Sequence, residues 1–400
     1  MMYSLLDYVK KSPVSHLLMS ITFVLSGIII NFVQCILFYC LRPFSKFYFR
    51  KINYYLAYSL HAELVFMAEW WSKSDVYIYI DKDDFKKYYG KEHAYLVMNH
   101  RYDIDWLMGW VFCERLGVLG NCKAYAKKSI QYVPTMGWGW KFSESVFLER
   151  SFDKDKEAIA RQIKELGDYP DPIWLLIFAE GTRYTEEKYE ASLTFAKDKG
   201  LPLLKHHLTP RTKGFTISIT NMRGKFNAVY NVQLAFKEDA KVKPTMMNLL
   251  FGKPIEAHLL IERIPLEEVP EKEEEAAKWL HDLYVKKDKM MDNFLKTGDW
   301  YDDKQKSIPP FLLPRRYFTF INMLFWTIVV LIPMVYLLIK LLFSGSTTSL
   351  SIAISIILLF FLMLYKLIEQ TKISKGSSYG KTTPTTPNQE VNIENLQEKD

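Results

Sequence analysis

Cysteine and glycosylation sequons are scarce in this sequence. Only four cysteines occur in 400 residues. Cys35 and Cys40 lie in a long apolar run, and Cys113 and Cys122 are not spaced as zinc ligands are. This scarcity argues against a disulfide framework and against a metal site. No Asn-x-Ser/Thr sequon is present, which fits a domain that is never glycosylated.

Strong charge of one sign is also missing. Lysine and arginine number 52 and aspartate and glutamate number 45, for a formal net charge of +7. Such a small excess favours an anionic membrane surface or substrate only weakly. The basic residues are dispersed among acidic ones and no aromatic motif for stacking bases accompanies them, so nucleic acid is not expected as a partner.

Long hydrophobic runs are present, and three of them are long enough to cross a bilayer. The first, Leu17–Leu41, is too long for the apolar part of a signal peptide and ends without a small-residue cleavage site. The other two, from about Phe318 to Phe343 and from about Leu350 to Leu367, are separated by a short polar turn. They predict a hairpin of two spans, the first of which contains Pro333.

Basic residues flank these runs unevenly. Lys10 and Lys11 precede the first run, whereas more lysines and arginines follow it, namely Arg42, Lys46, Arg50 and Lys51. The positive-inside bias therefore places the downstream domain in the cytosol. Arg315 and Arg316 before the hairpin agree with this orientation. Three spans would put Met1 on the opposite side of the membrane.

Composition divides the chain into five segments. They are an N-terminal membrane anchor (1–45), an interfacial helical region (46–75), a cytosolic domain (76–300), a transmembrane hairpin (316–368) and a polar tail (369–400) whose composition predicts disorder. The stretch Tyr54–Trp71 mixes aromatic residues with charged ones. It suits a helix at the headgroup boundary and equally an amphipathic core helix.

Strand-like and helix-like stretches alternate in the cytosolic segment. The expected strands, rich in β-branched and aromatic residues, are Val76–Ile80, Ala94–Met98, Trp174–Phe178, Thr216–Ile219 and Ala228–Phe236. The expected helices are Asp153–Leu166, Thr185–Lys197 and Glu271–Phe294, with Asp153 and Thr185 as caps. This alternation indicates an α/β layer whose chemistry lies on the loops that leave the strands.

One of these strands delivers a histidine. His100 follows the run Tyr95–Met98, and Asp105 comes five positions after the histidine. A histidine that takes a proton near neutral pH benefits from an anion on its second ring nitrogen. A capping or core histidine is the alternative. On an ideal helix Asp103 would face His100 better than Asp105. Choosing Asp105 therefore requires His100 to sit in the turn before the helix.

Three further blocks follow in order: Phe147-Leu148-Glu149-Arg150, then Ala179-Glu180-Gly181-Thr182-Arg183, then Pro210-Arg211-Thr212-Lys213. With the His-x4-Asp pair, they strongly resemble the glycerolipid acyltransferases typified by 1-acyl-sn-glycerol-3-phosphate acyltransferase. The wider superfamily usually has an apolar proline pair in the last block. The Pro-Arg-Thr-Lys form is similar to that of the animal gamma and delta branch, as are Phe251-Gly252-Lys253-Pro254 and Arg263-Ile264-Pro265-Leu266.

The resemblance implies a fold and a reaction. The fold would be α/β, a glycerolipid-acyltransferase-like mixed sheet flanked by helices, with one N-terminal and two C-terminal transmembrane helices. The reaction would move an acyl group from acyl-CoA to the sn-2 hydroxyl of lysophosphatidic acid, without a cofactor. The expected partners are acyl-CoA, lysophosphatidic acid and membrane lipids. The expected place is the endoplasmic reticulum membrane, with the domain facing the cytosol.

The resemblance also implies roles for residues. His100 would be the base, and Asp105 would orient it. The implied substrate-binding residues are Arg150, Glu180, Gly181, Thr182 and Arg183, with Lys127 and Lys128 as helpers. An ion pair with Glu180 is the alternative for Arg183, and a solvated surface is the alternative for the lysines. Backbone amides near the helix start after His100 are candidate oxyanion donors.

Two other functions stay open at this stage. In the first alternative, the acceptor would be another lysophospholipid, such as lysophosphatidylinositol or lysophosphatidylcholine. The core motifs do not distinguish these acceptors from lysophosphatidic acid. In the second, the chain would be an inactive membrane protein that uses the fold to bind lipid. Retention of His100, Asp105 and the later blocks together argues against that second alternative.

Overall fold

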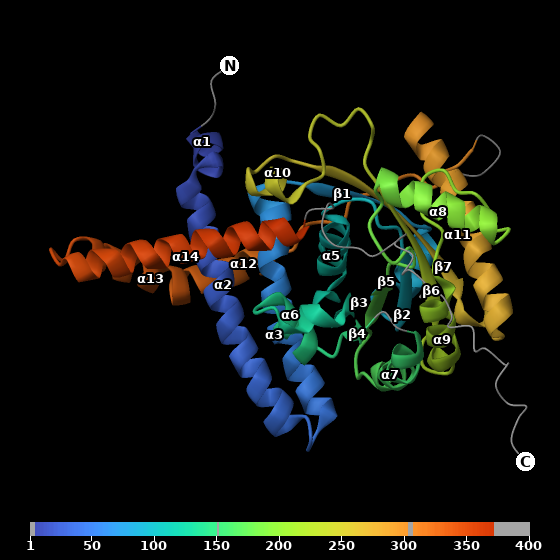
Figure 1. Ribbon diagram of the computed structural model, residues 1–400, viewed down its shortest axis with the longest axis horizontal. Coiled ribbons are helices and arrows are strands. Elements are labelled where there is room, and N and C mark those ends of the chain that lie inside the picture. Colours follow the sequence, from blue (N-terminus) through green and yellow to red (C-terminus); the bar gives the residue numbers. More distant parts are fainter. Residues whose placement is uncertain (1–4, 150–151, 303–306, 372–400) are drawn as a thin grey trace, which may run out of the picture.

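The computed structural model describes residues 5–149, 152–302 and 307–371 (Figure 1). Arg150, a predicted substrate-binding residue, lies outside these ranges. So does the predicted polar tail, apart from the few residues that end the last helix.

Within the described residues, the strands form one seven-stranded sheet in the order β1-β7-β6-β2-β5-β3-β4. The strands are β1 (Asp75–Tyr79), β2 (Ala94–Met98), β3 (Cys122–Lys127), β4 (Val146–Leu148), β5 (Trp174–Ile177), β6 (Ala228–Ala235) and β7 (Glu256–Pro265). Neighbouring strands are parallel except β6 and β7, which are antiparallel. The predicted mixed sheet is therefore confirmed.

Helices surround this sheet and extend away from it. Those before β5 are α1 (Leu5–Lys11), α2 (Pro13–Ile36), α3 (Lys46–Phe66), α4 (Lys82–Tyr88), α5 (Asp105–Leu116), α6 (Met136–Phe142) and α7 (Phe152–Leu166). Those after β5 are α8 (Glu186–Asp198), α9 (Thr212–Met222), α10 (Met246–Leu250), α11 (Glu273–Thr297), α12 (Phe318–Trp326), α13 (Ile332–Leu342) and α14 (Thr347–Thr371). Single π-helical turns, Leu37–Leu41, Met67–Trp71 and Thr327–Leu331, continue α2, α3 and α12.

Two helical layers cover the sheet, one on each face. Successive residues of a strand point to opposite faces. Accordingly, Leu96 and Met98 of β2 join a core cluster with α3 and α5, while Tyr95 and Val97 join a second cluster with α7, α9 and α11. Both faces of β2 are thus buried, which explains why its sequence is continuously apolar.

The strand expected at Thr216–Ile219 is wrong, because these residues lie inside α9. Their β-branched side chains favour strands, but tertiary packing overrides such a local preference. The helix buries Phe215 and Ile219 against the sheet, and the Thr220 hydroxyl donates back to the Thr216 carbonyl at 3.1 Å. The other four expected strands are present to within a residue or two.

The stretch Tyr54–Trp71 is mainly a core helix. Leu60, His61 and Glu63 of α3 are buried against the rest of the domain. Tyr55 on the outer side is exposed, together with Tyr48 in the preceding turns. The region predicted as interfacial is therefore an integral wall of the domain, with one aromatic edge open to its surroundings.

Three helices are long and apolar enough to span a membrane: Pro13–Leu41, Phe318–Leu342 and Thr347–Glu369. They match the three runs expected from the sequence. Figure 1 shows the hairpin of α13 and α14 projecting away from the sheet, and α2 crossing this hairpin. At this crossing the Ser20 hydroxyl of α2 donates to the Phe360 carbonyl of α14.

Candidate active site

His100 lies in the turn between β2 and α5, as expected, and Asp105 is the first residue of α5. His100 Nδ1 is 3.1 Å from Asp105 Oδ2. The same oxygen accepts hydrogen bonds from the backbone N–H groups of Arg101 (2.7 Å) and Tyr102 (2.9 Å). The carboxylate therefore holds both the imidazole and the turn that carries it. Asp103 faces elsewhere, with its carboxylate 4.0 Å from Arg183 Nη1.

The environment of His100 keeps its imidazole neutral. Its ring stacks on Phe178, with ring centroids 3.8 Å apart and an interplanar angle of 15°. Burial lowers the pKa of His100 below its ordinary value of 6.5, and the adjacent Asp105 carboxylate opposes part of that fall. With Nδ1 directed at Asp105, Nε2 is left to accept a proton from the cavity that His100 lines. This arrangement is that of a general base.

Glu180 supports the turn from behind. Its carboxylate accepts hydrogen bonds from the backbone N–H groups of His100 (2.9 Å) and Leu208 (3.1 Å). Burial raises the pKa of Glu180 to about 8, and these two donors and the nearby Lys287 ammonium oppose that rise. Glu180 does not line the cavity. The structure thus shows Glu180 holding the catalytic turn, and its contact with substrate stays a prediction.

The residues after Glu180 do reach the cavity. Gly181, Thr182 and Arg183 all line it. Gly181 has a φ of +73°, and a Cβ atom there would come within 2.9 Å of the Arg211 side chain. The expected close approach at this glycine is thus to a neighbouring arginine. Arg183 faces Asp103 rather than Glu180, so the alternative of an ion pair with Glu180 is not what the structure shows.

The two predicted helper lysines have different surroundings. Lys127 lines the cavity, whereas Lys128 pairs with Glu149 and does not. Both lysines are exposed, so the structure places only Lys127 beside the cavity and leaves the substrate role of each as a prediction. Two of the backbone amides near the start of α5, those of Arg101 and Tyr102, donate to Asp105 and so are already used.

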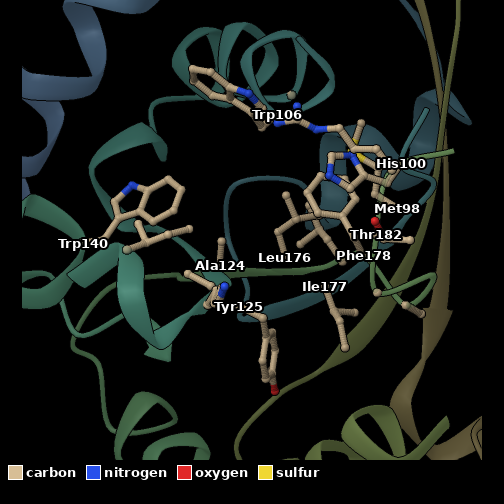
Figure 2. A pocket seen from close by; sticks show the side chains of 18 of the residues that line it. Met98, His100, Trp106, Ala124, Tyr125, Trp140, Leu176, Ile177, Phe178 and Thr182 are labelled. Atoms are coloured by element: carbon tan, nitrogen blue, oxygen red, sulfur yellow. The ribbon is translucent and has the colours of Figure 1, made fainter. Parts of the chain in front are cut away.

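The cavity in front of His100 has a volume of about 1430 Å³. Figure 2 shows His100, Phe178 and Thr182 on one side of it and Trp140 across from them. Most of the lining is apolar, and cationic side chains occur where the polar blocks meet it. Such a cavity suits a ligand with a long apolar part and an anionic part.

Comparison with known proteins identifies the family. A family model described as "Acyltransferase" matches residues 77–233, and one described as "Acyltransferase C-terminus" matches residues 248–326. The 1-acyl-sn-glycerol-3-phosphate acyltransferase gamma of Homo sapiens is 41% identical over 377 residues, which cover 94% of this chain and 97% of the relative. The delta enzyme of Bos taurus is 42% identical over 380 residues, with the same coverage. The chain belongs to the 1-acyl-sn-glycerol-3-phosphate acyltransferase family.

A solved structure is also similar to this acyltransferase. The 1-acyl-sn-glycerophosphate acyltransferase PlsC of Thermotoga maritima matches with a TM-score of 0.41 and 16% identity. That match covers 70% of this chain and 97% of the PlsC chain.

Five cationic residues of this acyltransferase line the cavity without having been predicted as site residues: Lys123, Lys188, Lys199, Arg211 and Lys213. Lys188 Nζ donates to the Thr182 hydroxyl at 3.0 Å, which ties α8 to the Glu-Gly-Thr-Arg block. The Pro-Arg-Thr-Lys block was the available signal for Arg211 and Lys213. Lys188 gave no signal, because it sits in a charged stretch of an expected helix.

Proposed function

We propose that this acyltransferase moves an acyl group from acyl-CoA to the sn-2 hydroxyl of 1-acyl-sn-glycerol-3-phosphate, producing phosphatidic acid and CoA for phospholipid synthesis. The observation that carries the proposal is the His100–Asp105 pair at the wall of a large apolar cavity with cationic side chains. The names of relatives at 41% and 42% identity support the choice of acceptor.

In this scheme His100 Nε2 removes the proton of the acceptor hydroxyl while its oxygen attacks the thioester carbonyl carbon. The tetrahedral intermediate then collapses with cleavage of the carbon–sulfur bond. The leaving thiolate takes the proton back from the imidazolium, so that CoA leaves as the thiol. Asp105 stabilises the imidazolium that forms in between. The acceptor hydroxyl takes the place that a serine has in hydrolases, and no cofactor or metal is required.

The phosphate of the acceptor requires cationic hydrogen-bond donors. Planar guanidinium groups suit phosphate oxygens because they bind two oxygens at once. Arg183 and Arg211 both line the cavity, and Lys188 and Lys213 add charge beside them. We assign the phosphomonoester to this group, with Lys127 as a further contact from β3.

The protein's place would be the endoplasmic reticulum membrane, with the sheet domain on the cytosolic side. Three apolar helices support attachment to a membrane. Both substrates and the product are lipids or acyl carriers found at such a surface. The basic residues around Arg315 and Arg316, where the hairpin begins, support the cytosolic side.

Purified protein assayed with a panel of acyl-CoAs against a panel of lysophospholipids tests this function. We expect His100→Ala to reduce turnover by roughly 10²- to 10⁴-fold or more, Asp105→Asn to cost a similar factor, and Asp103→Asn much less. Faster turnover of lysophosphatidylinositol than of lysophosphatidic acid would show that the proposed acceptor is wrong. No turnover of any pair by folded protein would support the lipid-binding alternative instead.

A further inference from the structure

The cavity extends from His100 to the base of the C-terminal hairpin. Its lining includes Met323 of α12 and three residues of α14, Leu364, Leu367 and Ile368. The hairpin was expected only to anchor the chain in a bilayer. Its base instead closes part of the apolar end of the cavity that contains the catalytic base.

Helix α14 has two different apolar faces. Leu364, Leu367 and Ile368 are spaced three and four residues apart, so they lie on one side of the helix. Leu364 and Ile368 also pack against the main core cluster of the domain. On other sides of the helix, Leu362 is 50% exposed and Tyr365 is 58% exposed. A membrane anchor needs only the exposed face, so the inner face calls for a separate explanation.

The base of the hairpin is fixed to the domain by polar contacts. Asn322 Nδ2 donates to the Ser59 carbonyl at 3.0 Å, and the Ser59 hydroxyl donates to Asn322 Oδ1 at 2.6 Å. Trp326 Nε1 donates to the same hydroxyl at 2.8 Å. Just before the hairpin, Arg315 Nη1 donates to the Glu69 carbonyl at 2.6 Å. These contacts fix α12 on the domain, and α14 is held there by the apolar packing of Leu364 and Ile368.

We infer that the hairpin base sets the length of the fatty acyl chain that the site accepts. The inference rests on the proposed function. A volume of about 1430 Å³ exceeds the 300–1,000 Å³ usual for ligand pockets, which suits a long flexible chain. Leu364 and its neighbours on α14 offer only apolar surface, which suits a hydrocarbon. The chain comes either from acyl-CoA or from the sn-1 position of lysophosphatidic acid.

Substitutions at Leu364 test the inference. Leu364→Trp fills the apolar end and Leu364→Ala enlarges it, while Leu362→Trp and Leu362→Ala change the same helix on its exposed side. Each variant is assayed with saturated acyl-CoAs of increasing length and a fixed lysophosphatidic acid. A second series fixes the acyl-CoA and lengthens the sn-1 chain. Leu367→Phe replaces Leu364→Trp if the tryptophan variant does not fold.

For Leu364→Trp we expect kcat/KM to fall by about fourfold for each methylene that no longer fits, so that the optimum moves to shorter chains. Leu364→Ala should move it to longer chains, and both Leu362 variants should keep the wild-type profile. A shift of the length optimum in the acyl-CoA series would show that the wall formed by α14 contacts the chain of the donor. A shift in the series of sn-1 chains would show that it contacts the chain of the acceptor.

Binding of both lipid series, measured by thermal stabilisation of the protein, provides a readout that does not depend on turnover. Unchanged length profiles in folded Leu364→Trp, or equal shifts in Leu362→Trp, overturn the inference. Wild-type protein that binds these lipids with a length dependence altered by Leu364→Trp, yet does not acylate lysophosphatidic acid, would instead contradict the proposed function alone.

Discussion

At the scale of single residues, one carboxylate oxygen organises the catalytic turn. Asp105 Oδ2 faces the imidazole of His100 and two backbone N–H groups at once. One oxygen therefore fixes both the orientation of the ring and the shape of the turn, while burial lowers the pKa of His100 and so favours the neutral imidazole that a base requires.

The pH dependence of turnover should reveal this pairing. Protonation of His100 abolishes the base, and burial lowers its pKa, so kcat should fall with decreasing pH with a midpoint below 6.5. Asp105 raises the pKa of His100. In Asp105→Asn the acidic limb should therefore move to lower pH while the plateau also falls. The acceptor phosphate titrates near pH 6 itself, so both proteins are compared with the same acceptor. An acidic limb that moves upward in Asp105→Asn would contradict this assignment.

Arg183 offers a second residue-scale prediction. If its guanidinium binds the acceptor phosphate, Arg183→Lys keeps the charge but loses the planar pair of donors. A charge-assisted hydrogen bond contributes about 1.5–3 kcal/mol, so KM for lysophosphatidic acid should rise about tenfold or more. KM for acyl-CoA and the melting temperature should change little. A lower melting temperature with both KM values impaired would show that Arg183 serves mainly to hold Asp103.

At the scale of elements, α11 is more than a charged outer helix. Its Lys287 is fully buried and donates to the Val97 carbonyl (3.1 Å), to Asn231 Oδ1 (2.7 Å) and to the Val232 carbonyl (2.7 Å). All three donors of the ammonium are therefore satisfied. The lysine ties α11 to the adjacent strands β2 and β6, just before β2 reaches the catalytic turn.

Lys287→Met should accordingly destabilise the fold, because it removes one donor from each of three buried acceptors, at about 1–3 kcal/mol for each group left unsatisfied. Its neighbour offers a matched control. Lys286 is exposed and pairs with Glu262, and such surface pairs contribute about 0–1 kcal/mol. Thermal unfolding in detergent compares Lys286→Met with Lys287→Met. Equal melting temperatures for the two variants would remove the structural role of Lys287.

The sequence predicted the catalytic turn but not this lysine, for a physical reason. His100 and Asp105 are close in sequence, and the choice between Asp103 and Asp105 depends only on whether the helix begins before or after His100. Lys287, in contrast, sits in a run of charged residues whose neighbours are solvated. Only the packing of α11 on the sheet determines which of them is buried. The same dependence on packing explains the wrong strand at Thr216–Ile219 and the unpredicted β3, β4 and β7.

At the scale of the whole molecule, α2 touches the domain at both of its ends. Near its start, the His16 ring lies 5.4 Å from that of Phe251. Near its end, Gln34 Nε2 donates to Asn53 Oδ1 at 2.9 Å and to the Ser143 hydroxyl at 3.4 Å. A helix that crosses a bilayer separates its ends by the full hydrocarbon thickness of about 30 Å. Contacts at both ends therefore favour a helix that lies along the membrane face of the domain.

This geometry changes the topology expected from hydropathy. Tags at Met1, in the loop at Asp239 and at the C-terminus should all be reached by antibody when only the plasma membrane is permeabilised. In that arrangement the hairpin crosses twice and returns the chain to the same side, while α2, although long and apolar enough to span, stays on the membrane face. A tag at Met1 that is protected while the Asp239 tag is reached would restore the three-span arrangement that the basic flanks suggested.

The place of β7 between β1 and β6 has a consequence for synthesis of the chain. Strand β1 is made early, but its sheet partner does not exist until the ribosome has translated from Tyr79 to beyond Glu256, which takes roughly 10 to 40 s at 5–20 residues per second. Throughout that interval β1 has an unpaired edge, and the first apolar helix has already left the ribosome. Until translation supplies β7, this part of the nascent chain can pair with a strand of another chain, which makes it the segment most open to aggregation during synthesis.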